Sequence, residues 1–595
     1  MNSKDLHAFY TEREERFSLS LKDITSKINV VSNIRLTTAV LFLGCIYLAL
    51  TKSTSFFYLL PVLLIAFVWM IFKHAQLFKQ KVHLENLVAI NARELKLLEN
   101  QYEKIYSGAE FNDPTHPYAH DLDLFGEGSF FQAVNRCNTI QGKHKFAHGL
   151  KTPLQHKQAI IARQAAIKEL SHRVDFRQHV AAAGNETEEE RGDYDELLAW
   201  LKQQPFVYSK KGFKFLLVII PAITTVAVAG AFFNPWVKTL AILLAIFQWG
   251  FLGIYIKRVN AFHESIGRKR GILEKYAHVL HFLQREKFES PVLTGLTNNA
   301  QQADQKLKHL ANLVGSFNAR SNALTSIFVN SILMYDLQYV YRLERWRSEN
   351  ENNLRRWLEA VSDIEVLNTW ATYAFNHQQF VYADISENLA LSAHELGHPL
   401  IEPTSCVTNN VQLGEGESIL IITGANMAGK STFLRTVGIN IVIALNGAPV
   451  FATKFNCPLI LLQTGMRTAD SLKDHQSYFY AELNRLKSIV DQLRSKLPLL
   501  ILLDEILKGT NSTDKQAGSI ALVKQLIPHH CLAMIATHDL ALGELEIEFP
   551  DHVKNFHFEP NIENDQLSFD YKLKRGIAEK MNATFLMKKM GIIPN

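Results

Sequence analysis

The octapeptide at residues 424–431, GANMAGKS, most constrains how this chain can fold, because its surroundings predict one supersecondary unit. The apolar run at residues 418–423 is typical of a buried strand, and residues 432–445 have the spacing of a helix. A glycine-rich loop between strand and helix directs backbone N–H groups toward phosphates. The sequence therefore predicts a nucleotide site in which Lys430 reaches the β- and γ-phosphates and the Ser431 hydroxyl binds Mg²⁺. A chance glycine turn is the weaker alternative, since it would not explain the strand-like run before the loop and the helical spacing after it.

Two further apolar runs carry polar residues that would complete such a site. Residues 499–503 have the pattern of a buried parallel strand and lead into Asp504 and Glu505. In P-loop chemistry the first acid orients Mg²⁺ and its water, and the second polarises the attacking water. The next run, residues 532–537, leads into His538, which we expect near the γ-phosphate because ligands bind beyond the carboxyl ends of parallel strands. Taken alone, the acids could end a surface strand and His538 could be a surface histidine, but their order favours the site.

These segments resemble the ATPase of the MutS mismatch-repair family, an ABC-type P-loop domain. The Asn426–Met427 pair is distinctive of that family's nucleotide loop, and residues 503–514 and 536–539 resemble its acidic strand and its Ala-Thr-His segment. The resemblance implies ATP and Mg²⁺ as cofactors and a head-to-head homodimer, in which Ser477 of a signature segment contacts the γ-phosphate bound by the opposite subunit. The expected nucleotide-binding residues are Gly424, Asn426, Met427, Gly429, Lys430, Ser431 and Thr432; the metal ligands are Ser431 and Asp504; the catalytic residues are Glu505, His538 and Ser477.

The resemblance extends to residues 121–170 and 354–591, which include segments similar to the family's core and lever helices. Some positions depart from the family pattern: Asn511 and Lys515 in the loop after the acids, and Cys406 where many members have a phenylalanine-led segment that stacks on adenine. No segment resembles the mismatch-sensing domain with its Phe-x-Glu reader. Mismatch recognition is therefore not implied for this chain.

Four apolar runs without charge form the second strong signal. They cover residues 36–51, 56–72, 215–233 and 239–256, and they are arranged as two hairpins. Runs of nearly twenty apolar residues are typical of membrane spans. Buried core helices are the alternative, which the paired arrangement makes less favourable. The sequence therefore predicts a variant of the MutS family that spans a membrane four times.

Lysine and arginine residues border both hairpins where each joins the rest of the chain. The turn between the two runs of each hairpin carries a single lysine, Lys52 or Lys238. By the positive-inside rule, we expect a multi-pass protein of the inner (cytoplasmic) membrane, with its N-terminus and ATPase in the cytoplasm. The five cysteines have no metal-like spacing, which fits a reducing compartment. The net charge of +5 is too small to argue for DNA by itself.

The expected fold class is a C-terminal α/β P-loop ATPase preceded by a mostly α-helical core and lever domain that transmembrane hairpins interrupt. Residues 291–299 are expected to break the helical pattern after the second hairpin. The expected domains are residues 1–35 (amphipathic helix), 36–73 (first hairpin), 74–120 (helical connector), 121–210 (first core part), 211–258 (second hairpin), 259–390 (lever helices) and 391–595 (ATPase).

Two functions of different class follow from these features. One is a membrane-anchored ATPase that binds mismatched, branched or otherwise distorted DNA in repair or recombination. The other is a membrane ATPase that uses the same engine on a membrane protein complex, with membrane proteins as partners. A transporter ranks third, because the four runs contain almost no charge that could line a substrate path.

Overall fold

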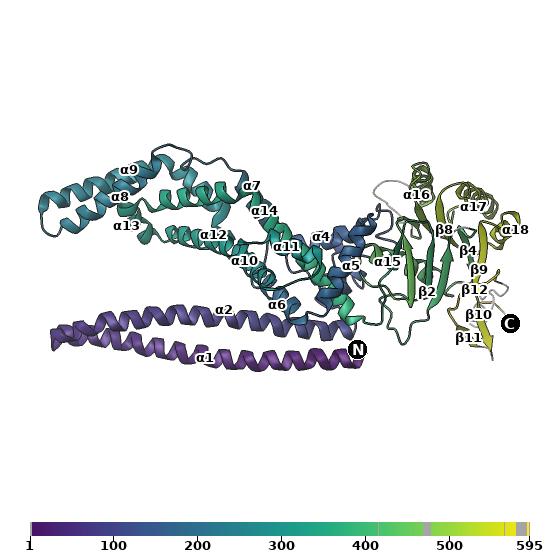
Figure 1. The fold of residues 1–595 in the computed structure, drawn as a ribbon, viewed down its shortest axis with the longest axis horizontal. Helices are drawn as coiled ribbons and strands as arrows, with labels where there is room; N and C mark the ends of the chain where they lie inside the picture. Colours follow the sequence, from purple (N-terminus) through teal and green to yellow (C-terminus); the bar gives the residue numbers. More distant parts are fainter. Residues whose placement is uncertain (1–2, 415, 468–477, 564–565, 579–591, 594–595) are drawn as a thin grey trace.

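The computed structural model describes the whole chain except residues 1–2, 415, 468–477, 564–565, 579–591 and 594–595. An elongated helical body leads into a C-terminal α/β part (Figure 1). The mostly helical fold with α/β sheets at its C-terminal end agrees with the predicted fold class at this coarse level.

A long N-terminal hairpin lies along one side of the body (Figure 1). It consists of α1 (Ser3–Thr51), the short 3₁₀ helix η1 (Thr54–Leu59) and α2 (Leu60–Leu98). The expected boundaries after residues 35 and 73 therefore fall inside continuous helices, since no capping residue or glycine interrupts the chain there. Only the basal part packs on the body: the Tyr10 hydroxyl donates to Asn376 at 2.7 Å, and Leu87 and Ile90 are buried against Ala182.

The body is built from short helices around one very long one, α14 (Tyr335–Asn376). The shorter helices are α3 (Phe130–Val134), α4 (Ile140–Lys151), α5 (Lys157–Ser171), α6 (Val174–Gly184), α7 (Asp193–Lys202), α10 (Arg270–Arg285), α11 (Pro291–Asn299) and α12 (Ala303–Phe317). The expected break at residues 291–299 is wrong, because this segment is helix α11. Its proline occupies the first helical turn, where a backbone N–H would have no hydrogen-bond partner within the helix, so its absence does not destabilise the helix.

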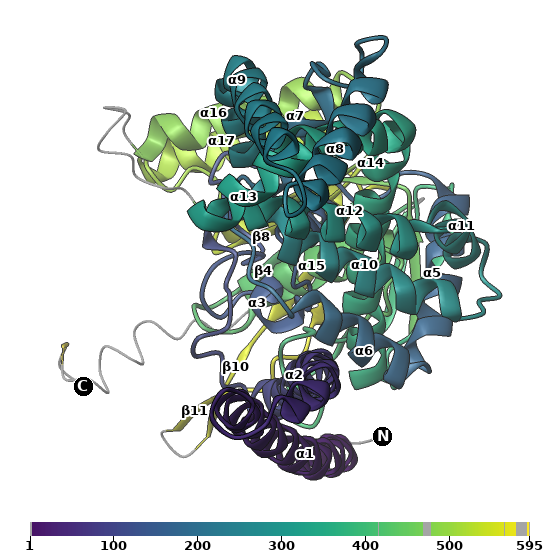
Figure 2. The ribbon, with the colours of Figure 1, turned by 90° about the vertical axis from the view of Figure 1, so that its left-hand side faces the viewer.

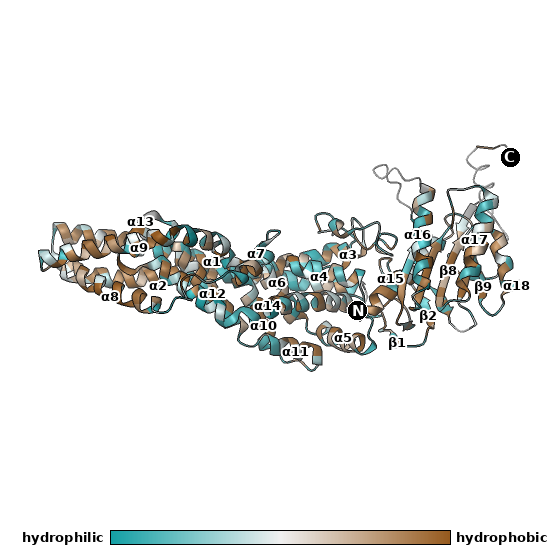
Figure 3. Ribbon diagram, turned by 90° about the horizontal axis from the view of Figure 1, so that it is seen from above, coloured by the Kyte–Doolittle hydropathy of each residue, from teal (hydrophilic) through white to brown (hydrophobic). Residues whose placement is uncertain are grey.

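The second hairpin consists of α8 (Phe213–Gly230) and α9 (Pro235–Ile266), and the short apolar helix α13 (Ala323–Leu333) packs against both. By length and composition, four helical segments could cross a membrane: Lys4–Thr51, Thr54–Leu98, Phe213–Gly230 and Pro235–Arg285. Apolar residues cover both hairpins at the same end of the molecule, far from the α/β part (Figure 3). Viewed from that end, the two hairpins stand apart from each other (Figure 2).

The α/β part holds a six-stranded sheet in the order β12–β9–β4–β8–β7–β6, whose strands are parallel except for β12. Its strands are β4 (Ile419–Gly424), β6 (Leu461–Gly465), β7 (Leu499–Asp504), β8 (Cys531–Thr537), β9 (Val553–Phe558) and β12 (Lys574–Arg575). The three strands predicted from apolar runs are thus present as neighbours. The register pairs Thr423 with Thr537 and Asp504 with Ala536, so their carboxyl ends lie side by side.

Helices and two smaller sheets complete this part. The helices are α15 (Lys430–Leu445), α16 (Tyr478–Leu493), α17 (Ser512–Leu526) and α18 (Leu545–Glu548). The second sheet has the order β1–β5–β2–β3, made of β1 (Asp384–Ser386), β2 (Leu391–Leu396), β3 (Asn409–Leu413) and β5 (Lys454–Pro458), and β10 (Pro560–Glu563) pairs with β11 (Gln566–Phe569).

Candidate functional site

The glycine-rich loop links β4 directly to α15, as the sequence predicts. Gly424 has φ +150°, and a Cβ there would collide with the carbonyl oxygen of Phe558 on β9. Gly429 has φ +107° and caps the N-terminus of α15. Both positions need glycine, because the backbone adopts a conformation that other residues avoid. The loop thus curls around the positive end of a 16-residue helix, which is an arrangement suited to anions.

Lys430 folds back into this loop. Its Nζ donates to the carbonyl oxygens of Gly424 at 2.7 Å and Ala425 at 3.0 Å, and lies 3.4 Å from Nε2 of His538. Burial lowers the pKa of Lys430 to about 8, although Asp504 and Glu505 act in the opposite direction. The ammonium group is therefore held inside the loop by weak carbonyl partners, where it is ready to exchange them for phosphate oxygens.

Glu505 and His538 form the centre of the polar edge. Glu505 Oε1 lies 2.6 Å from His538 Nε2, and Lys508 Nζ lies 3.6 Å from the other carboxylate oxygen. The hydrogen bond from His538, together with the nearby positive charges, lowers the pKa of Glu505 to about 2 despite partial burial. Glu505 is therefore a carboxylate at neutral pH, as a water-polarising group must be. The structure brings Asp504, Glu505, His538 and Lys430 together at the edge where the sequence places them.

Glu482 on α16 fixes the loop that carries Glu505. Its buried carboxylate accepts hydrogen bonds from the backbone N–H of Leu507 at 2.6 Å and of Lys508 at 3.1 Å. Glu505 and Leu507 both have positive φ, so the loop is strained and needs such support. The sequence pattern gave no indication of this contact. Ser477, the predicted contact to the opposite subunit, lies outside the described residues.

A cavity of about 440 Å³ opens beside the loop. All seven predicted nucleotide-binding residues except Gly424 line it, and so do Asp504 and Glu505. The cavity is also lined by residues that the sequence did not single out as base contacts, among them His398, Ile401 and Tyr571. Cys406 and Val407, which stand where many MutS-family members have a phenylalanine-led segment that stacks on adenine, line it too. The volume suits a nucleotide whose phosphates face the glycine-rich loop.

Comparison with known proteins agrees with these features. Residues 420–594 match the family model for MutS domain V. The chain is 28% identical over 306 residues to the DNA mismatch repair protein MutS of Listeria welshimeri, which covers 50% of this chain and 34% of that protein. It is 30% identical over 244 residues to the MutS protein homolog 4 of Mus musculus, covering 39% of this chain and 25% of the relative.

A third relative gives the same picture. The DNA mismatch repair protein MutS of Thermotoga sp. (strain RQ2) is 31% identical over 239 residues, covering 39% of this chain and 29% of that protein. The chain thus spans about a third or less of the length of these relatives. The similarity includes the region that holds the glycine-rich loop, Glu505 and His538. Together these matches support membership of the MutS family.

Proposed function

We propose that this protein is a membrane-anchored ATPase of the MutS family, which hydrolyses ATP as a dimer and transmits the resulting motion to its membrane hairpins. The ATPase part rests on Lys430, Asp504 and Glu505, which line one cavity beside the glycine-rich loop, and on His538, which contacts Lys430 and Glu505. The apolar surfaces of both hairpins carry the membrane part: Ile65, Trp69 and Val226 are 69%, 65% and 73% exposed. Such surfaces are unfavourable in water and suited to lipid.

Each polar residue has a distinct task in the proposed reaction. Lys430 and the N-terminal N–H groups of α15 bind the phosphates. Ser431 and Asp504 would hold Mg²⁺, which neutralises phosphate charge when bound. Glu505 orients and polarises the attacking water, and His538 holds the Glu505 carboxylate and lies close enough to Lys430 to sense the γ-phosphate. Ser477 of the second subunit would complete the site, so an isolated subunit should be a poor ATPase.

The nucleotide loop is joined to the helical body by a dense polar contact. Arg435 on α15 donates to the carbonyl oxygen of Asp121 at 3.0 Å, and the buried Asp121 carboxylate accepts from Thr464 at 2.6 Å and from the Arg467 N–H at 3.0 Å. Arg467 also pairs with Asp123. Movement of α15 on ATP binding would therefore shift residues 121–123 of the body.

The long helix α14 continues this path to the second hairpin. Near one end, the buried Glu365 accepts hydrogen bonds from the N–H groups of Asn138 and Thr139 in the body. Near the other end, the buried Glu344 accepts from the N–H groups of residues 206, 207 and 208, just before α8. With 42 residues, α14 is about 63 Å long. A rigid rod of this length couples the α/β part to the membrane end.

The membrane part of the proposal is tested by topology. The turns of the two hairpins contain Ser53 and Asn234, and both should face away from the ATPase across the bilayer. Ser53→Cys and Asn234→Cys, each in a chain whose five cysteines are replaced, are labelled with a membrane-impermeant maleimide in sealed proteoliposomes of known orientation. Reaction of both turns on the side opposite an Asp551→Cys control supports four spans. Reaction of all three on the same side rejects them.

DNA handling is the second candidate function, and the relatives named as DNA mismatch repair proteins favour it. ATP turnover of the dimer in lipid nanodiscs is measured with homoduplex, mismatched and branched DNA across a salt series. Stimulation by one DNA form that falls steeply with salt would support a DNA ligand, because phosphate contacts release counterions. If no DNA form changes the rate of ATP turnover, the result would instead favour the remodelling of a membrane protein complex.

A further inference from the structure

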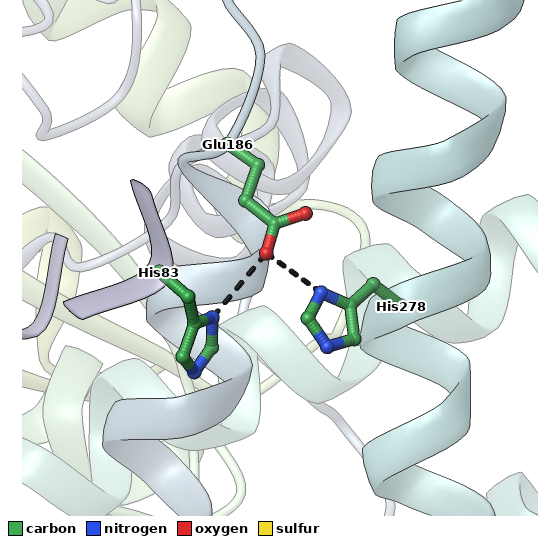
Figure 4. Close-up of side chains that lie close together, drawn as sticks. All are labelled: His83, Glu186 and His278. Carbon is green, nitrogen blue, oxygen red and sulfur yellow. Dashed lines mark hydrogen bonds and ion pairs between the residues drawn. The ribbon is translucent and has the colours of Figure 1, made fainter. Parts of the chain in front are cut away.

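Three side chains from separate parts of the chain point at one spot between the N-terminal hairpin and the body: His83 on α2, Glu186 just after α6, and His278 on α10 (Figure 4). Glu186 Oε1 lies 3.3 Å from His83 Nδ1 and 2.6 Å from His278 Nδ1. Their ligand atoms all lie within 4.8 Å of one another. We infer that these residues form a binding site for a zinc-class divalent metal ion, which fastens the N-terminal hairpin to the helical body.

The donor set and the spacing fit such an ion. Two imidazoles and a carboxylate are ligands that Zn²⁺ prefers, and a bound water would occupy the fourth position. Tetrahedral ligands at about 2.0–2.1 Å from zinc lie about 3.3 Å apart. The separation of Glu186 from His83 already has this value, and that from His278 must widen by a small rotation of the carboxylate.

The surroundings hold the ligands in place. His83 Nε2 lies 2.9 Å from Nδ1 of His179, so His83 can donate its remaining proton there while its Nδ1 faces the proposed ion. This outer hydrogen bond is typical of metal-binding histidines. The Phe282 ring packs against His83 and His278, with centroids 5.8 and 4.9 Å apart, which restricts both imidazoles. The side chains of His83, Glu186 and His278 are 13%, 21% and 35% exposed, so an ion could still reach the site.

The position of the site gives it a mechanical role. One turn before His83, Lys79 pairs with Glu274 on α10 at 2.7 Å, and soon after it Asn86 donates to the carbonyl oxygen of Ala182 at the end of α6. These contacts lie where α2 leaves the body and runs with α1 toward the apolar end (Figure 1). A metal ion there would replace weak contacts with coordinate bonds and set the angle of the first hairpin.

The test measures metal binding rather than ATP turnover. Full-length protein in nanodiscs is stripped with a chelator, kept free of nucleotide and titrated with Co²⁺, whose absorption reports tetrahedral coordination. We expect one equivalent per chain with that spectrum. His83→Ala or Glu186→Gln should weaken binding by at least about 100-fold, since even outer partners of metal ligands contribute 10–100-fold. His281→Ala is the matched control. His281 lies on α10, as His278 does, and pairs with Asp304 at 2.9 Å, but the described residues offer no third metal ligand there.

A second readout separates binding from fastening. Amide hydrogen exchange along residues 77–98 is compared with Zn²⁺ and with chelator. We expect amide exchange to be slower with Zn²⁺ than with chelator in the native chain and in His281→Ala. In His83→Ala we expect the two exchange rates to be equal. Absence of the tetrahedral Co²⁺ spectrum, or equal affinity in Glu186→Gln, would overturn the metal site and leave a hydrogen-bonded cluster. Metal binding that leaves exchange unchanged would overturn the fastening role.

Discussion

Lys430 combines a buried position with a task that requires charge. Its pKa of about 8, lowered by burial, means that the side chain without nucleotide loses its proton as the pH rises through 8. Phosphates favour the charged form, so ATP binding above this pH must take up a proton. We therefore expect ATP affinity to be constant below pH 7 and to fall by about tenfold per pH unit above pH 8.

A non-hydrolysable ATP analogue titrated between pH 6.5 and 9.5 gives the measurement. Lys430→Arg is the control, since arginine stays charged throughout this range and should remove the pH dependence even where its affinity is lower. The same slope in native protein and Lys430→Arg would show that another group takes up the proton. Lys430→Ala should weaken nucleotide binding at every pH.

Glu505 is the residue whose loss should separate binding from hydrolysis. Glu505→Gln keeps the shape of the side chain but cannot polarise water, so we expect ATP turnover to fall by about 10²–10⁴-fold while ATP still binds. The variant should trap ATP and lock the dimer, which size-exclusion chromatography with ATP detects. Retention of native turnover would remove Glu505 from its assigned role.

His538 supports that carboxylate and gives a prediction about acid stability. Because the folded pKa of Glu505, about 2, lies below its usual value, the pair stabilises the fold above pH 4.5 and loses this contribution as the pH falls toward 2. His538→Ala should therefore be less stable than the native chain at pH 6, and the difference should shrink below pH 4. Urea denaturation at a series of pH values checks this. A difference that persists at pH 2.5 would contradict the assigned pair.

At the scale of elements, one carboxylate on α14, Glu344, holds the segment that leads into the second hairpin. Glu344→Ala would leave three backbone N–H groups without this partner, one buried and two partly buried, and a buried N–H without a partner costs about 1–3 kcal/mol. We expect a clear loss of thermal stability and faster amide exchange at residues 205–215, with nucleotide binding retained. Glu349→Ala on the same helix is the control, because Glu349 is 48% exposed and pairs only with Arg345. If Glu344→Ala and Glu349→Ala change thermal stability and amide exchange equally, the Glu344 contact does not hold this segment.

The elements near the nucleotide site could be predicted because local patterns determine them. The apolar runs at residues 418–423, 499–503 and 532–537 predicted three strands, and the parallel register brings their polar ends together. Glu482, Asp121 and Glu344 could not be found in this way, since each acts on backbone groups far away in sequence. Helix α11 was missed because a proline can begin a helix as well as break one.

Helix α13 lies within the lever helices expected over residues 259–390, but its position beside the second hairpin was not predicted. Its 11 residues are too few to span a bilayer, so length alone gave no signal. In the structure it packs on α8 and α9, and Trp249 donates to Ser331 at 2.9 Å, while Phe328 is 68% exposed. It connects directly through Met334 to α14. The lever therefore ends in an apolar helix beside the second hairpin, which strengthens the proposed coupling to the membrane.

At the scale of the whole molecule, the α/β part, which holds the nucleotide cavity, and the apolar ends of both hairpins lie at opposite ends of an elongated body (Figure 3). The two hairpins are attached differently. The first hairpin, formed by α1 and α2, contacts the body at its base. The second hairpin is held by α13 and α14. The first hairpin is thus suited to anchor the protein, and the second to receive motion from the ATPase.

This division predicts different outcomes when either hairpin is replaced. Exchange of residues 215–256 for a soluble helical linker should leave the protein bound to membranes through the first hairpin and leave ATP affinity unchanged, but abolish any difference in ATP turnover between nanodiscs and detergent. Exchange of residues 36–72 should weaken membrane attachment and preserve that difference for molecules still inserted. Flotation and turnover assays on the same preparations measure both properties. Glu344 on α14 joins the path from Arg435 and Asp121 to the segment just before the second hairpin, so unchanged membrane-dependent turnover after removal of that hairpin would mean that this path does not carry the coupling.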